Sequence, residues 1–188
     1  MRKSTPSSLE YALLGALAQK PQSGYDLRKA FAETPMRHYS DSPGSIYPAL
    51  QRLKARKWVS AVRDKHSARR REVFQIAQAG KEGMRRWLEE PFDRTHVVHH
   101  LGILLLRFAF FDGNLNRTRA LNFLVHLEQE LADYVSELED YAASSGVTES
   151  VNTGALVYSY GLDSYRALLS WARGARKQLS SAQQPKRG

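Results

Sequence analysis

Hydrogen-bonding and cationic side chains are concentrated between Ser42 and Lys57, in the stretch S-P-G-S-I-Y-P-A-L-Q-R-L-K-A-R-K. If this stretch is a helix, Ile46, Leu50 and Leu53 form one apolar stripe that faces a core. The candidate contact residues lie off that stripe, and they are Ser45, Tyr47, Pro48, Gln51, Arg52 and Lys54. A glutamine can bind adenine through two hydrogen bonds, and an arginine can bind guanine or a phosphate. The stretch therefore predicts a helix that contacts the base edges and the backbone of duplex DNA.

The distribution of charge favours this interpretation over that of an ordinary solvated helix face. The 188-residue chain has a formal net charge of +9. Residues 1–91 hold 18 Lys and Arg against 9 Asp and Glu, whereas residues 92–188 hold 10 of each. All of the excess charge therefore belongs to the first half. This pattern is typical of a nucleic-acid-binding domain followed by a neutral domain with another task.

The elements that would position these residues form a winged helix-turn-helix. Leu9 to Gln19 has the apolar spacing of a first helix, and Ser23 can cap a second one. Beyond the third helix the pattern changes, because W-V-S-A-V-R and E-V-F-Q-I-A are rich in β-branched and aromatic residues. These two runs indicate the strands of a hairpin. A fourth helix is predicted from Gln78 to Pro91.

The start of the third helix has two possible positions. If Ser42 is the cap, Pro43 occupies the first helical position, and Pro48 lies beyond the first turn, where it removes a hydrogen bond. If Ser45 is the cap, Pro48 takes the third helical position without that loss. The sequence leaves both positions open.

A basic loop joins the two predicted strands. We expect this loop to contact DNA phosphates or to enter a minor groove. The residues predicted to do so are Lys65, His66, Arg69 and Arg70. Arg71 is left out because strand geometry can turn it inward. Tyr25 and Arg28 on the second helix are further candidates for phosphate contact. An anionic membrane is a weaker candidate partner, since the cations lie on a hairpin loop rather than on an amphipathic helix.

The second half of the chain is predicted to be helical. After a linker from Pro91 to Val98 come an apolar helix over 99–111, a long helix over 115–143 and a last helix over 153–179. Apolar residues of the long helix repeat at spacings of three and four, which indicates a heptad seam. The predicted dimer contacts are these residues and one tryptophan of the last helix, namely Leu124, Leu127, Leu131, Tyr134, Leu138 and Trp171. So much apolar surface on few helices favours a two-fold homodimer.

The predicted fold class is mainly α with a small β-hairpin. Residues 1–91 are the expected winged helix-turn-helix DNA-binding domain, and residues 92–181 are the expected helical dimerisation and effector domain. Residues 182–188 are expected to be a disordered tail.

Several other classes of function are disfavoured. No phosphate-binding loop, zinc-helix motif or nucleophile motif occurs, so neither an enzyme nor a cofactor is expected. The chain has no cysteine, which fits a reducing cytoplasm, and His96, His99 and His100 lack the further ligands of a zinc site. No signal peptide is expected, and the apolar run over 101–111 is too short to span a membrane.

Together these segments resemble the PadR family of winged-helix transcriptional regulators. The resemblance is carried by S-L-E-Y-A-L-L-G-A-L from Ser8, S-G-Y-D-L from Ser23, S-P-G-S-I-Y-P-A-L-Q-R-L from Ser42 and R-R-R-E-V-F-Q-I-A-Q-A-G from Arg69. In the second half, L-L-L-R-F-A-F-F and Y-G-L-D-S-Y-R-A-L-L-S-W-A resemble the subgroup with long C-terminal helices, which includes virulence activators. The wing departs from the family pattern, because it lacks the usual glycine-rich turn.

The resemblance implies DNA binding, dimerisation through the C-terminal helices and, in many members, release by a small effector. Trp87 is either a core residue or part of an aromatic effector pocket between the two halves. We therefore expect a cytoplasmic homodimer that binds an inverted-repeat operator and responds to a small aromatic effector, with repression favoured. The alternatives are a transcriptional activator of the same fold and a protein-interaction adaptor that does not bind specific DNA.

Overall fold

A capping box begins the first helix, α1 (Ser8–Gln19). The Ser7 backbone N–H donates to the Glu10 carboxylate at 2.7 Å, and the Glu10 N–H donates to the Ser7 hydroxyl at 3.3 Å. Both donors would otherwise lack a partner within the helix. Leu13 and Leu14 on this helix are completely buried. The helix is therefore fixed at its start and lies in the core of the N-terminal unit.

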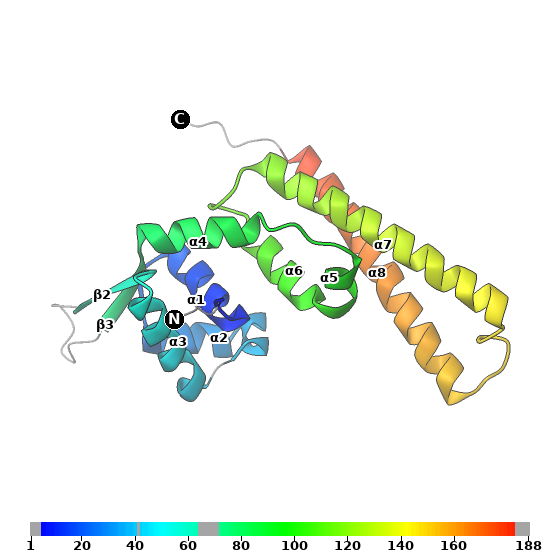
Figure 1. The fold of residues 1–188 in the computed structure, drawn as a ribbon, viewed down its shortest axis with the longest axis horizontal. Coiled ribbons are helices and arrows are strands. Elements are labelled where there is room, and N and C mark those ends of the chain that lie inside the picture. The colour runs from blue at the N-terminus through cyan, green and yellow to red at the C-terminus, as the bar shows by residue number, and fades with distance from the viewer. Residues whose placement is uncertain (1–4, 41, 64–71, 183–188) are drawn as a thin grey trace. The chain divides into compact units, whose positions relative to one another are not determined.

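The next two helices form a helix-turn-helix pair. α2 (Gly24–Ala32) begins at a second capping box, between Ser23 and Asp26, and α3 spans Pro43–Ala55. A short 3-10 helix, η1 (Pro35–His38), lies in the connection. α3 packs against both α1 and α2 (Figure 1). The apolar side chains of the pair that are almost fully buried are Leu27, Phe31, Ile46, Leu50 and Leu53.

A small antiparallel sheet completes this unit. Its strands are β1 (Gln22–Ser23), β2 (Val59–Arg63) and β3 (Glu72–Ile76), in the order β1-β3-β2. β2 and β3 are the predicted hairpin, whereas β1 is too short to show a periodic pattern in the sequence. α4 (Gln78–Leu88) follows β3 directly. The predicted fold class, mainly α with a small β-hairpin, is confirmed, with one strand added.

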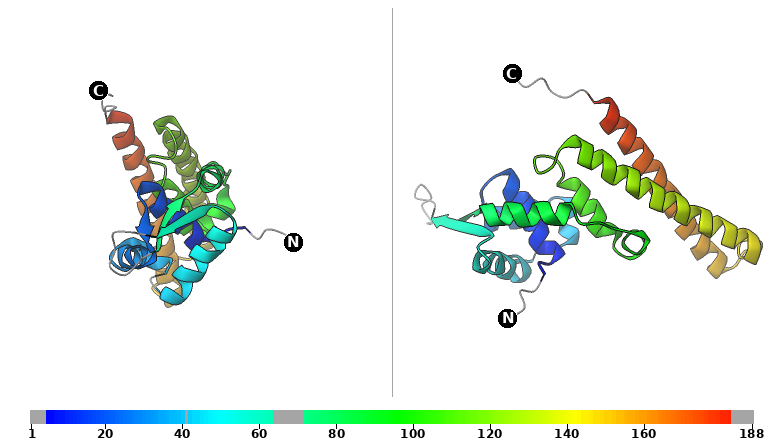
Figure 2. Two further views of the ribbon diagram at one scale, coloured as in Figure 1. Left: turned by 90° about the vertical axis from the view of Figure 1, so that its left-hand side faces the viewer. Right: turned by 45° about the horizontal axis from the view of Figure 1, so that its top comes forward.

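The second unit is helical over the residues described. Its helices are α5 (Arg94–His99), α6 (Leu101–Ala109), α7 (Arg117–Ser145) and α8 (Thr153–Ser181). α5 falls within the segment predicted as a linker and begins where the Asp93 side chain accepts from the His96 N–H at 3.3 Å. Gly146 ends α7 in the left-handed region, with φ 64°. The chain can therefore turn back, and α7 and α8 lie side by side (Figures 1 and 2).

The computed structural model describes residues 5–40, 42–63 and 72–182. The chain divides into two compact units, Met1–Glu90 and Pro91–Gly188, one residue before the expected boundary. Of the expected tail, Ala182 caps α8, and residues 183–188 lie outside the described ranges. None of the helices in these ranges is both long and apolar enough to cross a membrane.

The heptad seam of α7 is packed inside its own chain. Leu124, Leu127 and Leu131 are each 0% exposed, and the last two belong to a core that α5, α6 and α8 complete. The prediction that these three leucines contact a second copy is therefore corrected, because the chain itself covers them. Tyr134 and Leu138 are half-buried.

Candidate nucleic-acid interface

The start of α3 is decided by the structure. Ser42 is the N-cap residue and Pro43 occupies the first turn, so Pro48 lies inside the helix. The Ser42 carbonyl accepts from the Ile46 N–H at 3.0 Å, which closes the first helical turn. Pro48 has no N–H to donate to the carbonyl of Gly44, but Gly44 is exposed and water can replace that bond. Ser45 is therefore an exposed residue of the first turn rather than the cap.

The two faces of α3 differ as the spacing predicted. Ile46, Ala49, Leu50 and Leu53 are each 0% exposed and hold the helix to the core. The exposed face presents the predicted contact residues Ser45, Tyr47, Pro48, Gln51, Arg52 and Lys54. A rigid helix with a buried stripe and an exposed row of hydrogen-bonding groups is suited to enter a major groove.

Tyr47 also connects the two helices of the motif. Its ring lies directly over Gly24 at the start of α2, because a Cβ on Gly24 would come within 2.5 Å of the Tyr47 Cε1 atom. The tyrosine is still 42% exposed. Only glycine allows so close an approach here, so Gly24 helps to set the position of α2 against the start of α3.

Two of the predicted cations are held by carboxylates that the sequence patterns did not reveal. The Arg52 Nε donates to the Glu10 Oε1 at 2.9 Å, and the Lys54 Nζ lies 2.7 Å from the Glu72 Oε1. Arg52 thus connects α3 with α1, and Lys54 connects α3 with β3. The side chains of both cations remain partly exposed, 52% and 43% respectively.

The remaining predicted contacts lie on α2 and on the wing. Tyr25 is 47% exposed, and the Arg28 guanidinium lies 5.4 Å from the centre of its ring. The wing candidates Lys65, His66, Arg69 and Arg70 lie outside the described residues. The strands that flank this loop are paired up to Arg63 and Glu72. Both ends of the loop therefore start from a paired ladder.

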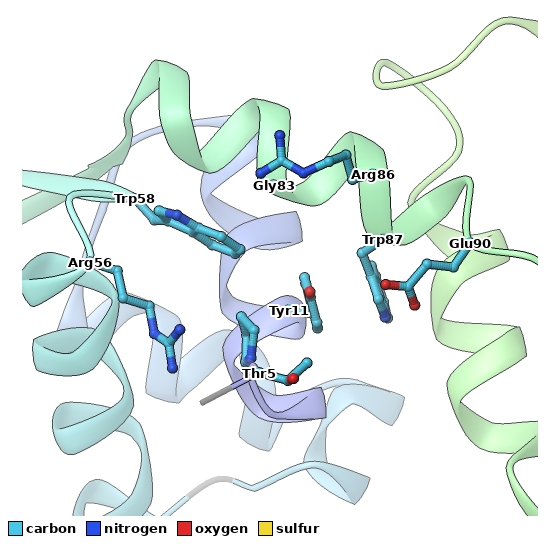
Figure 3. Close-up of a pocket in the computed structure, with 9 residues that line it drawn as sticks. Thr5, Tyr11, Arg56, Trp58, Gly83, Arg86, Trp87 and Glu90 are labelled. Carbon is cyan, nitrogen blue, oxygen red and sulfur yellow. The ribbon is translucent and has the colours of Figure 1, made fainter. Parts of the chain in front are cut away.

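Trp87 lines a cavity within the N-terminal unit. Its ring stacks on Tyr11 with centroids 4.1 Å apart and planes at 4°, and Trp58 lies 6.3 Å from Tyr11 (Figure 3). The cavity has a volume of about 580 Å³ and is lined by Thr5, Pro6, Tyr11, Arg56, Trp58, Gly83, Arg86, Trp87 and Glu90. Burial, with a smaller effect of the Glu90 charge, raises the pKa of Tyr11 to about 12, so its hydroxyl stays protonated at neutral pH.

His96 has a local role at the start of α5. The His96 Nδ1 lies 2.7 Å from the Asp93 Oδ1, and this hydrogen bond lowers the pKa of Asp93. Within the ranges that the structure describes, no three His, Cys, Asp or Glu side chains are grouped to hold a metal ion.

The C-terminal unit leaves an apolar row exposed on α8. Leu156, Val157 and Tyr160 are 61%, 70% and 75% exposed, and Trp171 is 41% exposed. Trp171 also contacts the ring of Phe108 edge-on, with centroids 5.9 Å apart. These side chains, rather than the buried leucines of α7, are available to a second chain.

The N-terminal unit matches a known family. Residues 13–86 fit the profile described as the Transcriptional regulator PadR-like family, which spans the helix-turn-helix, the sheet and most of α4. A probable transcriptional regulator of Mycobacterium tuberculosis is 27% identical over 89 residues. These residues are 47% of this chain and 47% of that protein, so the chain spans about half the length of its curated relative.

Solved structures resemble the chain over most of its length at low identity. Bacillus subtilis PadR in complex with operator DNA is 20% identical, with a TM-score of 0.42, over 92% of this chain and 99% of that one. The same protein in complex with p-coumaric acid is also 20% identical, with a TM-score of 0.39, over 96% and 99%. The Vibrio cholerae virulence activator AphA is 18% identical, with a TM-score of 0.39, over 92% and 98%.

Proposed function

We propose that the protein is a homodimeric, sequence-specific repressor that acts in the cytoplasm, on the premise that residues 13–86, which match the PadR-like family of transcriptional regulators, belong to its DNA-binding domain. The observation that carries the proposal is the exposed face of α3, where Ser45, Gln51 and Arg52 stand opposite a fully buried stripe. Gln51 would bind adenine and Arg52 guanine or phosphate, while the basic wing would follow the backbone. A bound dimer covers its site, so occupancy alone can repress transcription.

Salt-dependent binding to duplex DNA tests this function. An operator selected from random duplexes by the full-length protein should bind more tightly than a shuffled duplex, and both affinities should fall steeply with salt. Gln51→Ala should cost about 1–3 kcal/mol on the operator and little on the shuffled duplex. Fluorescence anisotropy measures the affinities for the operator and for the shuffled duplex. No retention on DNA at low salt would instead favour an adaptor that binds an acidic protein surface.

The exposed row of α8 is the surface we propose for dimerisation. Leu156, Val157 and Tyr160 would be costly to leave in water as one apolar patch, and a two-fold partner covers the same patch on both chains. Two recognition helices related in this way meet half-sites about 34–36 Å apart on one face of the duplex. The operator should therefore be an inverted repeat.

The cavity beside Trp87 is the site we propose for a small aromatic effector. Its volume falls within the usual range of ligand pockets, about 300–1,000 Å³. Tyr11, Trp58 and Trp87 supply ring faces, and Arg86 supplies a guanidinium that can bind a carboxylate. A flat aromatic acid suits this lining. Since Arg56 caps the end of α3, a ligand here could displace the recognition helix.

Tryptophan fluorescence tests this site with p-coumaric acid, a flat aromatic acid, as the probe. A Trp171→Phe background leaves Trp58 and Trp87 as the fluorophores, since the chain has three tryptophans. We expect saturable quenching that p-coumaryl alcohol, which lacks the carboxylate, does not match. Arg86→Ala should weaken the acid about tenfold, which corresponds to one charge-assisted hydrogen bond. If the Trp171→Phe protein binds the acid equally well with and without Arg86→Ala, this cavity is not the effector site.

A further inference from the structure

The Glu10 carboxylate is placed to control the orientation of Arg52. Its side chain is only 3% exposed, although it belongs to a charged residue. The Oε2 atom accepts from the Ser7 N–H at 2.7 Å, and the Oε1 atom accepts from the Arg52 Nε at 2.9 Å. Each oxygen therefore has a partner, one at the start of α1 and the other on α3. Because the Ser7 bond fixes the carboxylate, Glu10 cannot follow a moving arginine.

The contact with Glu10 occupies only one edge of the Arg52 guanidinium. Arg52 uses its Nε to bind Glu10, which leaves the Nη1 and Nη2 end for a two-pronged contact. The side chain is 52% exposed on the face of α3 that also carries Gln51. An arginine held at Nε has fewer rotamers to lose when it binds, and its outer edge points in one direction. Such an arginine can distinguish a base edge from a phosphate.

We propose that Glu10 is a positioning residue for DNA recognition, which holds Arg52 so that α3 discriminates its operator from other sequences. This inference rests on the proposed function. Without the carboxylate, Arg52 could turn to any nearby phosphate. Loss of a negative charge close to DNA would also strengthen binding that does not depend on sequence. Removing the Glu10 carboxylate should therefore reduce the specificity of DNA binding rather than its affinity in general.

A double-mutant cycle of Glu10→Gln and Arg52→Ala tests the proposal in the full-length protein. Affinities for the selected operator and for a shuffled duplex of equal length are measured by fluorescence anisotropy. Glutamine can still accept the Ser7 N–H, so the capping box is retained. We expect Glu10→Gln to lower the ratio of operator to shuffled affinity about tenfold, the size of one lost bidentate base contact. In the Arg52→Ala background the same change should have almost no effect on this ratio.

A control separates positioning from helix stability. Ser7→Ala removes the hydroxyl that accepts the Glu10 N–H at 3.3 Å but leaves the Glu10–Arg52 ion pair in place. It should lower thermal stability without changing the specificity ratio. The proposal is overturned if Glu10→Gln lowers the ratio equally with and without Arg52, or leaves the ratio unchanged in the wild-type background. If the wild-type ratio itself equals one, the proposed function fails instead.

Discussion

Replacing Leu131 with Asp should unfold the C-terminal unit rather than separate two folded protomers. Leu131 is 0% exposed within a core that includes Leu127, Leu162 and Leu169. The substitution loses the buried leucine and places a carboxylate inside this apolar core. We expect a loss of more than about 4 kcal/mol in the free energy of unfolding. Far-UV circular dichroism should show a large loss of helix at room temperature.

Tyr160→Asp is the matched control for this experiment. Tyr160 is 75% exposed on α8, so the charged side chain can remain in water when the protomer folds. The variant should keep its helix content while its sedimentation coefficient falls to that of a monomer. A Leu131→Asp protein that keeps its helix content and sediments as a monomer would show that the seam of α7 is the dimer contact after all.

Replacing Gly80 with Ala should destabilise the N-terminal unit by about 3 kcal/mol, although alanine is the better helix former. A Cβ on Gly80 would lie 2.2 Å from the Trp58 carbonyl oxygen. That oxygen accepts from the Ala77 N–H at 2.8 Å, and the Trp58 N–H donates to the Leu53 carbonyl at 3.0 Å. Because Trp58 is held through both its N–H and its carbonyl, α4 itself must move to admit the methyl group.

Thermal unfolding measures the effect, with Gly102→Ala as the control. A Cβ on Gly102, in α6, would meet nothing within 4 Å. This control should stabilise its helix by up to about 1 kcal/mol, since alanine loses less backbone freedom on folding. Gly80→Ala should lower the melting temperature of its unit by more than about 10 °C. A melting temperature within 2 °C or so of the wild type would mean that α4 shifts without cost.

Periodicity alone predicted the long helices well. The expected helices over 115–143 and 153–179 are observed as Arg117–Ser145 and Thr153–Ser181. Long helices repeat their pattern many times, so small errors at the ends do not obscure it. Short elements lack this redundancy. The sequence patterns therefore did not predict β1 or α5. In the structure, β1 is identified by its pairing with β3, and α5 begins at a cap formed by Asp93.

Only part of the candidate site could be predicted, because a local sequence pattern determines the exposed face of a helix but not its distant partners. The exposed positions Ser45 and Gln51 follow from the helical period of α3, since its apolar stripe determines which side is left in water. The partners of Arg52 and Lys54 do not follow from any local period. Glu10 lies on α1 and resembles an ordinary capping residue, although it is also the ion-pair partner of Arg52 on α3.

The sequence by itself determined the basic N-terminal half, the helix-turn-helix order and the face of α3 that meets solvent, because local spacing and composition carry this information. Only the tertiary structure decided that α3 starts after Ser42, that Leu124, Leu127 and Leu131 are covered by their own chain, and that Glu10 holds Arg52. An apolar heptad pattern indicates that a helix face must be buried. It does not indicate whether the same chain or a second chain buries that face. That choice, like each long-range ion pair, depends on which distant segments the folded chain brings together.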